Sequence, residues 1–409
     1  MKFNYRLAAV CFAALAVNLP MAWISLSKLV LLIAAIASLA QDIRQTGWSS
    51  LKPQTPLTWL VLVIVSLFGM SIIWTEVDTN FAWVAWVKHA KLLEVILITQ
   101  LVRSYKEAVA ALTSLLCGHG FVLLLSYLQA VGIALPSMLV SPYNPNIVFA
   151  ESYIDQGVMT VVFVSLLWHL QRFLKLPSWL VALLCGAGLF NVLALLPGRT
   201  GFVIAALVVG LAVMWALPKR LQLPALMVVP ILVAGLAFVA SGKVQEGFKK
   251  IYSESQDYAA AGNSATSIGW RLNAWHRSLQ AIHDQPLGYG VGSWAIAVKR
   301  QQINNAEASF GSGNSSNPHQ EYLLWGVALG LPGIGLVLAL LASLTQQALK
   351  AQTHVSRAAL SLIAVMASTC LFNSAIYDDL IGDFLCISLG LVLALCRQHP
   401  KSRSESLVH

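Results

Sequence analysis

The sequence is poor in charged residues, which make up 11% of its 409 residues, whereas hydrophobic residues make up 57%. Soluble domains typically contain about 25% charged residues, so this deficit excludes an ordinary soluble protein and indicates an integral membrane protein. A transmembrane β-strand alternates in polarity over about 10 residues, whereas runs such as Leu57–Trp74 and Phe202–Leu217 are almost continuously apolar. Because such runs are long enough to cross a hydrocarbon core of roughly 30 Å as helices, we predict an all-α polytopic membrane protein.

Cysteine is absent from the long polar segment 242–320, and no pair of histidines has the spacing of metal ligands. This excludes a disulfide framework and a zinc-type site, so we predict no cofactor and no metal. All six cysteines lie in or at the ends of apolar segments: Cys11, Cys117, Cys185, Cys370, Cys386 and Cys396. The alternative is a divalent ion at one of two acidic sets: Glu76 with Asp78, or Asp378 with Asp379 and Asp383.

We predict twelve transmembrane helices from the apolar runs, the first being retained because it lacks a convincing cleavage site. Residues 1–241 hold nine of them, 242–320 form one large, mostly helical loop, 321–396 hold three more, and 397–409 form a tail. The predicted spans are 7–25, 28–41, 57–74, 83–102, 108–133, 154–171, 179–196, 202–217, 224–241, 321–346, 357–376 and 381–396.

Basic residues divide unequally between the two faces of this topology, with fifteen in short segments on one face and two, Lys28 and Arg199, on the other. By the positive-inside rule, we predict that both termini are cytoplasmic and that the large loop lies on the outer face of the membrane. The net charge of +9 therefore reports orientation in the membrane lipid, and we infer no nucleic-acid partner. The fifteen are Lys2, Arg6, Arg44, Lys52, Arg103, Lys106, Arg172, Lys175, Lys219, Arg220, Lys350, Arg357, Arg397, Lys401 and Arg403. The outer loops instead carry acids: Glu76, Asp78, Glu151, Asp155, Asp378, Asp379 and Asp383.

The predicted sidedness limits the chemistry. The outer face of a bacterial inner membrane has no ATP or nucleotide sugars, so group transfer there needs a donor already activated in the membrane. A lipid diphosphate is the obvious kind. Two arginines, which keep their charge, and one histidine, which can take up or release a proton, lie on that face and suit such a donor.

Arg199 lies in the turn Leu196–Gly201, between two apolar helices. It is an arginine in a short outer loop, where the positive-inside pattern disfavours basic residues. Gly198 and Gly201 leave room for close approach, and Thr200 is placed to cap the next helix. Because a helix N-terminus beside an arginine is an anion-binding site, we predict a phosphate contact. The alternative is an interfacial arginine that snorkels to lipid headgroups.

Arg271 lies in the large loop, where Trp270, Arg271 and Trp275 have the spacing of an amphipathic helix. This spacing places aromatic side chains near the membrane interface beside the arginine, which we predict to hold a phosphate. The alternative is an arginine in contact with solvent or lipid headgroups. Three other basic residues of the loop compete for the role: Arg277, Lys299 and Arg300.

His319 lies in the segment Asn317–Leu323, directly before the tenth predicted span. The Gly/Ser/Asn-rich stretch Gly311–Asn317 delivers it to the membrane surface, and histidine is the side chain best suited to take up a proton near neutral pH. We therefore predict that His319 is catalytic. The alternative is a structural histidine, and its partner is left open because Glu321 is too close along the chain to assume.

Two further patterns are weaker indications of function. The stretch Gly288–Ser293 has no preceding strand, so we interpret it as a flexible turn whose N–H groups are available to an anion. In the fourth span, Lys88, Lys91 and Glu94 follow one another at a spacing of three. We predict that Lys91 pairs with Glu94 on one helix face, and a substrate or proton path is the alternative.

Four segments together resemble the O-antigen ligase/polymerase superfamily. They are Arg-Thr-Gly at 199–201, Gly-Trp-Arg at 269–271 with Trp275, Gly-Tyr-Gly-Val-Gly-Ser at 288–293, and Asn-Pro-His-Gln-Glu-Tyr-Leu at 317–323. Twelve spans with one large periplasmic loop between the ninth and the tenth resemble this superfamily as well. The resemblance covers the whole chain in architecture and is specific over about 190–325. Many members have Asn or Ser after the histidine, whereas Gln320 stands here, so no role is carried over to position 320.

The resemblance implies a C-type glycosyltransferase fold in the bacterial inner membrane and a metal-independent, inverting transfer at the periplasmic face. The donor would be a polysaccharide on undecaprenyl diphosphate and the acceptor a sugar hydroxyl of lipid A–core. Arg199 and Arg271 would hold the diphosphate, and His319 would act at the acceptor hydroxyl. The alternatives are an O-antigen polymerase with a lipid-linked glycan acceptor, a protein O-oligosaccharyltransferase and, from a different class, a membrane transporter.

Overall fold

The computed structural model describes residues 4–51, 55–141, 144, 146–150, 152–196, 198–240, 242–304 and 317–400. These residues form helices and connecting turns, and apart from two isolated β-bridges they contain no β-structure. Ten of their helices are long and apolar enough to cross a membrane, and two apolar helices are shorter. The predicted all-α polytopic membrane protein is therefore confirmed.

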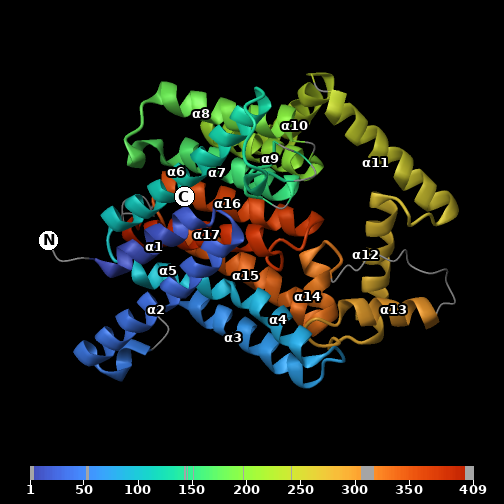
Figure 1. Ribbon diagram of the computed structural model, residues 1–409, viewed down its shortest axis with the longest axis horizontal. Coiled ribbons are helices and arrows are strands. Elements are labelled where there is room, and N and C mark those ends of the chain that lie inside the picture. The colour runs from blue at the N-terminus through green and yellow to red at the C-terminus, as the bar shows by residue number, and fades with distance from the viewer. Residues whose placement is uncertain are drawn as a thin grey trace.

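The helices run through the chain in an order that Figure 1 follows by colour. In the first half they are α1 (Tyr5–Ala16), α2 (Met21–Thr46), α3 (Pro56–Met70), α4 (Thr79–Ala90), α5 (Leu92–Leu101), α6 (Tyr105–Ala130), α7 (Tyr153–Leu174), α8 (Ser178–Phe190) and α9 (Arg199–Ala216). The second half holds α10 (Lys219–Ala240), α11 (Gly242–Ala261), α12 (Ser267–Asp284), α13 (Trp294–Asn304), α14 (Glu321–Leu329), α15 (Leu331–Leu349), α16 (Thr353–Phe372) and α17 (Asp379–Gln398).

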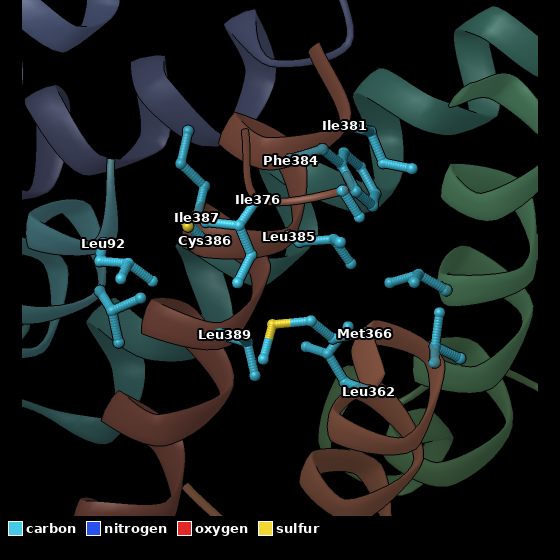
Figure 2. Close-up of a cluster of buried hydrophobic side chains, with 14 of the residues drawn as sticks. Leu92, Leu362, Met366, Ile376, Ile381, Phe384, Leu385, Cys386, Ile387 and Leu389 are labelled. Carbon is cyan, nitrogen blue, oxygen red and sulfur yellow. The ribbon is translucent and has the colours of Figure 1, made fainter. Parts of the chain in front are cut away.

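Helix α17 is the centre of the bundle. It packs against α5, α6, α7 and α16, and 94% of its most apolar stretch is buried inside the protein. Figure 2 shows how Phe384, Leu385 and Leu389 of α17 lie among side chains of neighbouring helices, including Met366 of α16 and Leu92 of α5. A helix that is apolar on most sides is stable in such a buried position, so α17 forms the core against which these four helices pack.

The first predicted span differs from the structure. A single helix was predicted over 7–25, but α1 ends at Ala16 and α2 begins at Met21, directly after Pro20. Proline cannot donate a helical hydrogen bond, and the Asn18 amide between the helices donates to the carbonyl of Leu115 at 3.3 Å. Lys28 was predicted to lie in an outer loop. This prediction is wrong, because Lys28 lies inside α2.

Two other predicted spans are interrupted. The span predicted at 83–102 is divided between α4 and α5 at Lys91, and the span predicted at 321–346 is divided between α14 and α15 at Gly330. Gly330 has φ +70°, and a Cβ there would lie 1.8 Å from the Pro286 carbonyl oxygen. Only glycine fits such a position, so this break is built into the sequence.

The predicted pairing of Lys91 with Glu94 is also wrong. The Lys91 ammonium donates to the carbonyl of Asp378 at 2.6 Å and pairs with the Asp379 carboxylate at 3.3 Å. Lys88 pairs with the same carboxylate at 3.1 Å. The two lysines therefore connect the α4–α5 junction to the start of α17, and the pairing is between helices because the break at Lys91 ends the regular spacing.

Helices α11, α12 and α13 form an arm beside the bundle, on the far side from α2 (Figure 1). The arm begins at the end of α10, and α12 packs against α11, α13 and α14. The Thr266 hydroxyl caps α12 by accepting a hydrogen bond from the Gly269 amide at 3.1 Å. The arm thus returns to the bundle at α14, which places α12 next to the segment that holds His319.

Candidate functional site

Arg271 lies on α12 and reaches across to the end of α16. Its Nη1 donates to the Phe372 carbonyl at 3.2 Å, one of the last carbonyls of α16, where the helix dipole favours a cation. Burial lowers the pKa of Arg271, and the nearby positive charge of Arg199 acts in the same direction. Arginine stays charged under such conditions, so two guanidinium groups repel each other here and an anion between them would be stabilised.

Arg199 is the first residue of α9, directly after Gly198. A Cβ at Gly198 would lie 2.9 Å from the ring of Tyr153 at the start of α7, so glycine permits the close approach that the sequence predicted. The start of α9 has no side-chain cap hydrogen bond, and the predicted cap by Thr200 is wrong because Thr200 is itself inside the helix. The N-terminus of α9 beside Arg199 has the charge and the N–H donors that bind anions.

His319 sits in a constrained turn before α14. The Asn317 Oδ1 accepts a hydrogen bond from the His319 amide at 2.9 Å and one from the Ser374 hydroxyl at 3.0 Å. His319 has φ +49°, a left-handed conformation that costs on the order of 1–3 kcal/mol and is found at functional sites. The turn is therefore fixed both locally and from the loop after α16.

The His319 ring is oriented by Asn373. Its Nδ1 lies 3.2 Å from the Asn373 Oδ1, and since an amide oxygen only accepts, Nδ1 carries the proton and Nε2 keeps its lone pair. The edge of the ring meets Trp270, with centroids 5.3 Å apart. Burial lowers the pKa of His319, the Arg271 charge lowers it further, and the Asn373 hydrogen bond opposes them. The ring is thus neutral at pH 7 and Nε2 can accept a proton.

The first residues of α14 form hydrogen bonds to the loop after α16, which contains Asn373. The Gln320 side chain caps α14 by accepting from the Leu323 amide at 2.6 Å, which gives this position a structural role. The buried Glu321 carboxylate accepts from the Ile376 amide at 2.9 Å and from the Trp325 indole at 2.7 Å. Glu321 thus stabilises the His319 site, because its hydrogen bonds join α14 to the segment between α16 and α17.

The tryptophans of α12 pack into the site. The Trp275 Nε1 donates to the Pro318 carbonyl at 3.1 Å, and Trp270 contacts His319. Two of the three competing basic residues have partners elsewhere, since Arg277 is buried and donates to Asn273 at 2.5 Å, and Arg300 pairs with Glu76. The third, Lys299, is exposed. Among the basic residues proposed for the loop, Arg271 is the one whose charge acts on His319 and on which the charge of Arg199 acts.

Most of the acidic residues considered for a divalent ion have other partners. Glu76 pairs with Arg300, Asp379 with Lys88 and Lys91, and Asp383 with Lys28 at 2.8 Å. The Asp78 side chain caps α4 through the Asn80 amide at 2.9 Å. Within the residues that the structure describes, no group of three or more acids, histidines or cysteines is arranged to hold a metal.

The glycine-rich stretch 288–293 was predicted to offer its N–H groups to an anion. In the structure most of these N–H groups instead donate to partners inside the protein. The amides of Tyr289 and Gly290 donate to carbonyls of α14 at 2.8 and 2.9 Å, and the Val291 amide donates to the Ser71 hydroxyl at 3.0 Å. A Cβ at Gly290 would lie 2.7 Å from the Ser71 carbonyl oxygen. The glycines therefore allow a buried turn to pack closely between α3 and α14.

Asn373 is the main site residue that the sequence did not reveal. It lies 54 positions after His319 and belongs to no charged or glycine-rich pattern. Tyr153, next to Gly198, was missed for the same reason. The stretch Gly311–Asn317, predicted to carry His319 to the membrane surface, lies outside the described residues except for Asn317.

The lowered pKa of His319 predicts how a reaction that uses this ring as a base depends on pH. A base must be neutral, so the rate of such a reaction should fall at acid pH with a midpoint below 6.5, the ordinary value for histidine. Asn373→Asp places a carboxylate on Nδ1, which favours the charged ring, and should move this fall to higher pH. The measurement is the initial rate of the reaction against pH for both proteins. An unchanged profile in Asn373→Asp would mean that another group titrates.

Comparison with known proteins adds one match. Residues 187–338 match the family model described as O-antigen ligase. The matched range contains Arg199, Arg271 and His319, together with the arm and the start of α15. No curated protein matches the chain.

Proposed function

Because the match over residues 187–338 supports membership of the O-antigen ligase/polymerase superfamily, we propose that this membrane protein is an O-antigen ligase. It transfers a polysaccharide from undecaprenyl diphosphate to a sugar hydroxyl of lipid A–core at the periplasmic face of the bacterial inner membrane. The observation that carries this proposal is the arrangement of Arg199 and Arg271 beside a neutral, oriented His319.

The two arginines supply what a diphosphate leaving group needs. As the bond from the sugar to the diphosphate breaks, negative charge develops on the phosphate oxygens, and preorganised donors stabilise it. Guanidinium groups bind phosphate in a bidentate manner, and the uncapped N-terminus of α9 adds backbone donors. The repulsion between Arg199 and Arg271 is relieved when the diphosphate lies between them.

His319 supplies the base. Its Nε2 takes the proton of the acceptor hydroxyl while the acceptor oxygen forms a bond to the anomeric carbon and the diphosphate leaves with the bonding electrons. Asn373 keeps the proton on Nδ1 and so fixes Nε2 as the acceptor. A direct displacement of this kind inverts the anomeric centre.

The charge pattern supports the sidedness of the proposal. Helices α7 and α9 begin, and α16 ends, at the site, so the site lies at one end of these three spans. The opposite ends carry Arg172, Lys219 and Arg357, which the positive-inside rule assigns to the cytoplasm. Both termini are then cytoplasmic, and residues 242–320 form a periplasmic loop.

A reconstituted transfer assay tests the function. Purified protein receives a glycan on undecaprenyl diphosphate and, in separate reactions, lipid A–core or a second lipid-linked glycan as acceptor. A ligase attaches the glycan to lipid A–core only. Extension of the lipid-linked glycan instead would make the protein an O-antigen polymerase, and no transfer in either reaction would refute both assignments.

We expect transfer to persist in excess EDTA. Arg199 and Arg271 provide the positive charge at the diphosphate. Most of the acids considered for a divalent ion have other partners: Glu76, Asp379 and Asp383 pair with basic residues, and Asp78 caps α4. The same assay with and without EDTA measures this, with magnesium and manganese added back as the control. Loss in EDTA that either ion restores would contradict it and direct attention to Glu76, Asp78, Asp378 and Asp379.

A further inference from the structure

A second positively charged region lies at the far ends of the helices that build the candidate site. A cavity of about 180 Å³ opens between α7, α9 and α16, near the end of α7 and the start of α16. Helix α7 has 22 residues and therefore spans roughly 33 Å. The cavity is thus separated from Arg199 and Arg271 by about the thickness of a membrane core.

The cavity wall carries positive charge and no acid. Arg172, His354 and Arg357 line it, together with two tryptophans and small or uncharged residues. Over the part of the chain that the structure describes, neither Arg172 nor Arg357 forms an ion pair with an acidic side chain. The positive charge at this cavity is therefore uncompensated within the described protein.

The start of α16 adds to this positive potential. The first residue of α16 is Thr353, and its N-cap residue Gln352 makes no side-chain cap hydrogen bond. A helix of 20 residues carries about half a positive charge at such an end. The N-terminus of α16 and the two guanidinium groups thus converge on one cavity, which favours an anion with several acceptor oxygens.

The aromatic wall indicates that the anion is attached to an apolar group. Trp168 is 46% exposed on a membrane-spanning helix, and the ring of Trp215 lies under the Arg357 guanidinium, 5.9 Å from it. Tryptophan and arginine together are typical of the level of lipid headgroups in a membrane. Ala212 and Ala216 of α9 complete the wall with small side chains, leaving room for a headgroup or the first part of an acyl chain.

We propose that this cavity binds the phosphate of an anionic glycerophospholipid from the leaflet opposite to the candidate active site. Basic pockets between transmembrane helices on the cytoplasmic side bind lipid headgroups of this class. Arg172 and Arg357 hold the phosphate, and the two tryptophans contact the glycerol and acyl region. The site is independent of the transfer reaction, because it shares no side chain with Arg199, Arg271 or His319.

Lipid binding to the purified full-length protein tests the proposal. Phosphatidylglycerol is titrated into the protein in detergent, and native mass spectrometry measures the fraction that retains lipid. Arg172→Gln and Arg357→Gln should each weaken binding about tenfold, the effect of losing one charge-assisted hydrogen bond. Arg44→Gln, at the exposed end of α2, is the matched control and should bind as the natural protein does. Phosphatidylcholine, which has no net charge, should bind more weakly.

Two outcomes would overturn the proposal. Binding that stays unchanged in both variants would show that lipid attaches elsewhere. Displacement of phosphatidylglycerol by millimolar inorganic phosphate would show that the ligand is a soluble phosphate and not a lipid. Arg172 is exposed, so Arg172→Gln should fold normally and keeps the test valid even if Arg357→Gln does not fold.

Discussion

Replacement of His319 by alanine is expected to reduce glycan transfer by about 10²- to 10⁴-fold, the usual contribution of a general base. The affinity for the lipid-diphosphate donor should change little, because the proposed mechanism assigns Nε2 to the acceptor hydroxyl and the two arginines to the phosphates. The measurement is a paired one on each variant: the affinity for the donor, and the rate of transfer to lipid A–core.

The matched control for this experiment is His276→Ala, an exposed histidine on α12 that makes one hydrogen bond, to Gln280. It should leave both quantities unchanged. If His319→Ala loses donor affinity as severely as Arg271→Ala, His319 is a phosphate ligand and the base lies elsewhere. Normal turnover in His319→Ala would mean that this histidine is structural.

Arg199→Lys and Arg271→Lys are each expected to reduce transfer by roughly 10²- to 10³-fold, the loss found when one preorganised donor to a developing anion is removed. Lysine keeps the charge but lacks the planar fork that contacts two phosphate oxygens. Donor binding should weaken as well, which separates these variants from His319→Ala. Protein levels in the membrane should be normal, because the charge is retained.

Arg300→Lys is the corresponding control. Arg300 is an exposed arginine of the same arm, and it pairs with Glu76 away from the site. The Arg300→Lys variant should transfer glycan at the rate of the natural protein. If either Arg199→Lys or Arg271→Lys also transfers at that rate, the assignment of that arginine to the diphosphate fails.

The sequence predicted the features that depend on composition. Continuous apolar runs such as 57–74 indicated a span, and α3 covers Pro56–Met70, so it begins one residue before this run. The sequence did not predict the helix breaks at Lys91 and Gly330, because hydropathy contains no information on helix caps or on positive φ angles. The error at Lys28 has a related cause: the helix break falls at Pro20, so Lys28 lies one turn or more into α2 and meets Asp383.

The candidate site was predictable in its charged residues and not in the residues that orient them. Arg199 and His319 stood out because arginine and histidine are rare at such places in a membrane sequence. Asn373 did not, because an amide after a long apolar helix has many uses, and only the fold brings it to His319. The glycines at 288 and 290 were noticed, but the amides of Tyr289 and Gly290 donate to carbonyls of α14, a partner that sequence spacing cannot supply.

The central position of α17 has a consequence for biosynthesis. This helix is translated well after α5, which lies about 280 residues earlier in the chain and packs directly against it. At roughly 5–20 residues per second, α5 waits on the order of a quarter of a minute to a minute for its partner. During this delay Lys28 and Lys91 have no Asp383 or Asp379 to pair with. A chain whose synthesis stops before α17 therefore keeps both lysines without their acidic partners.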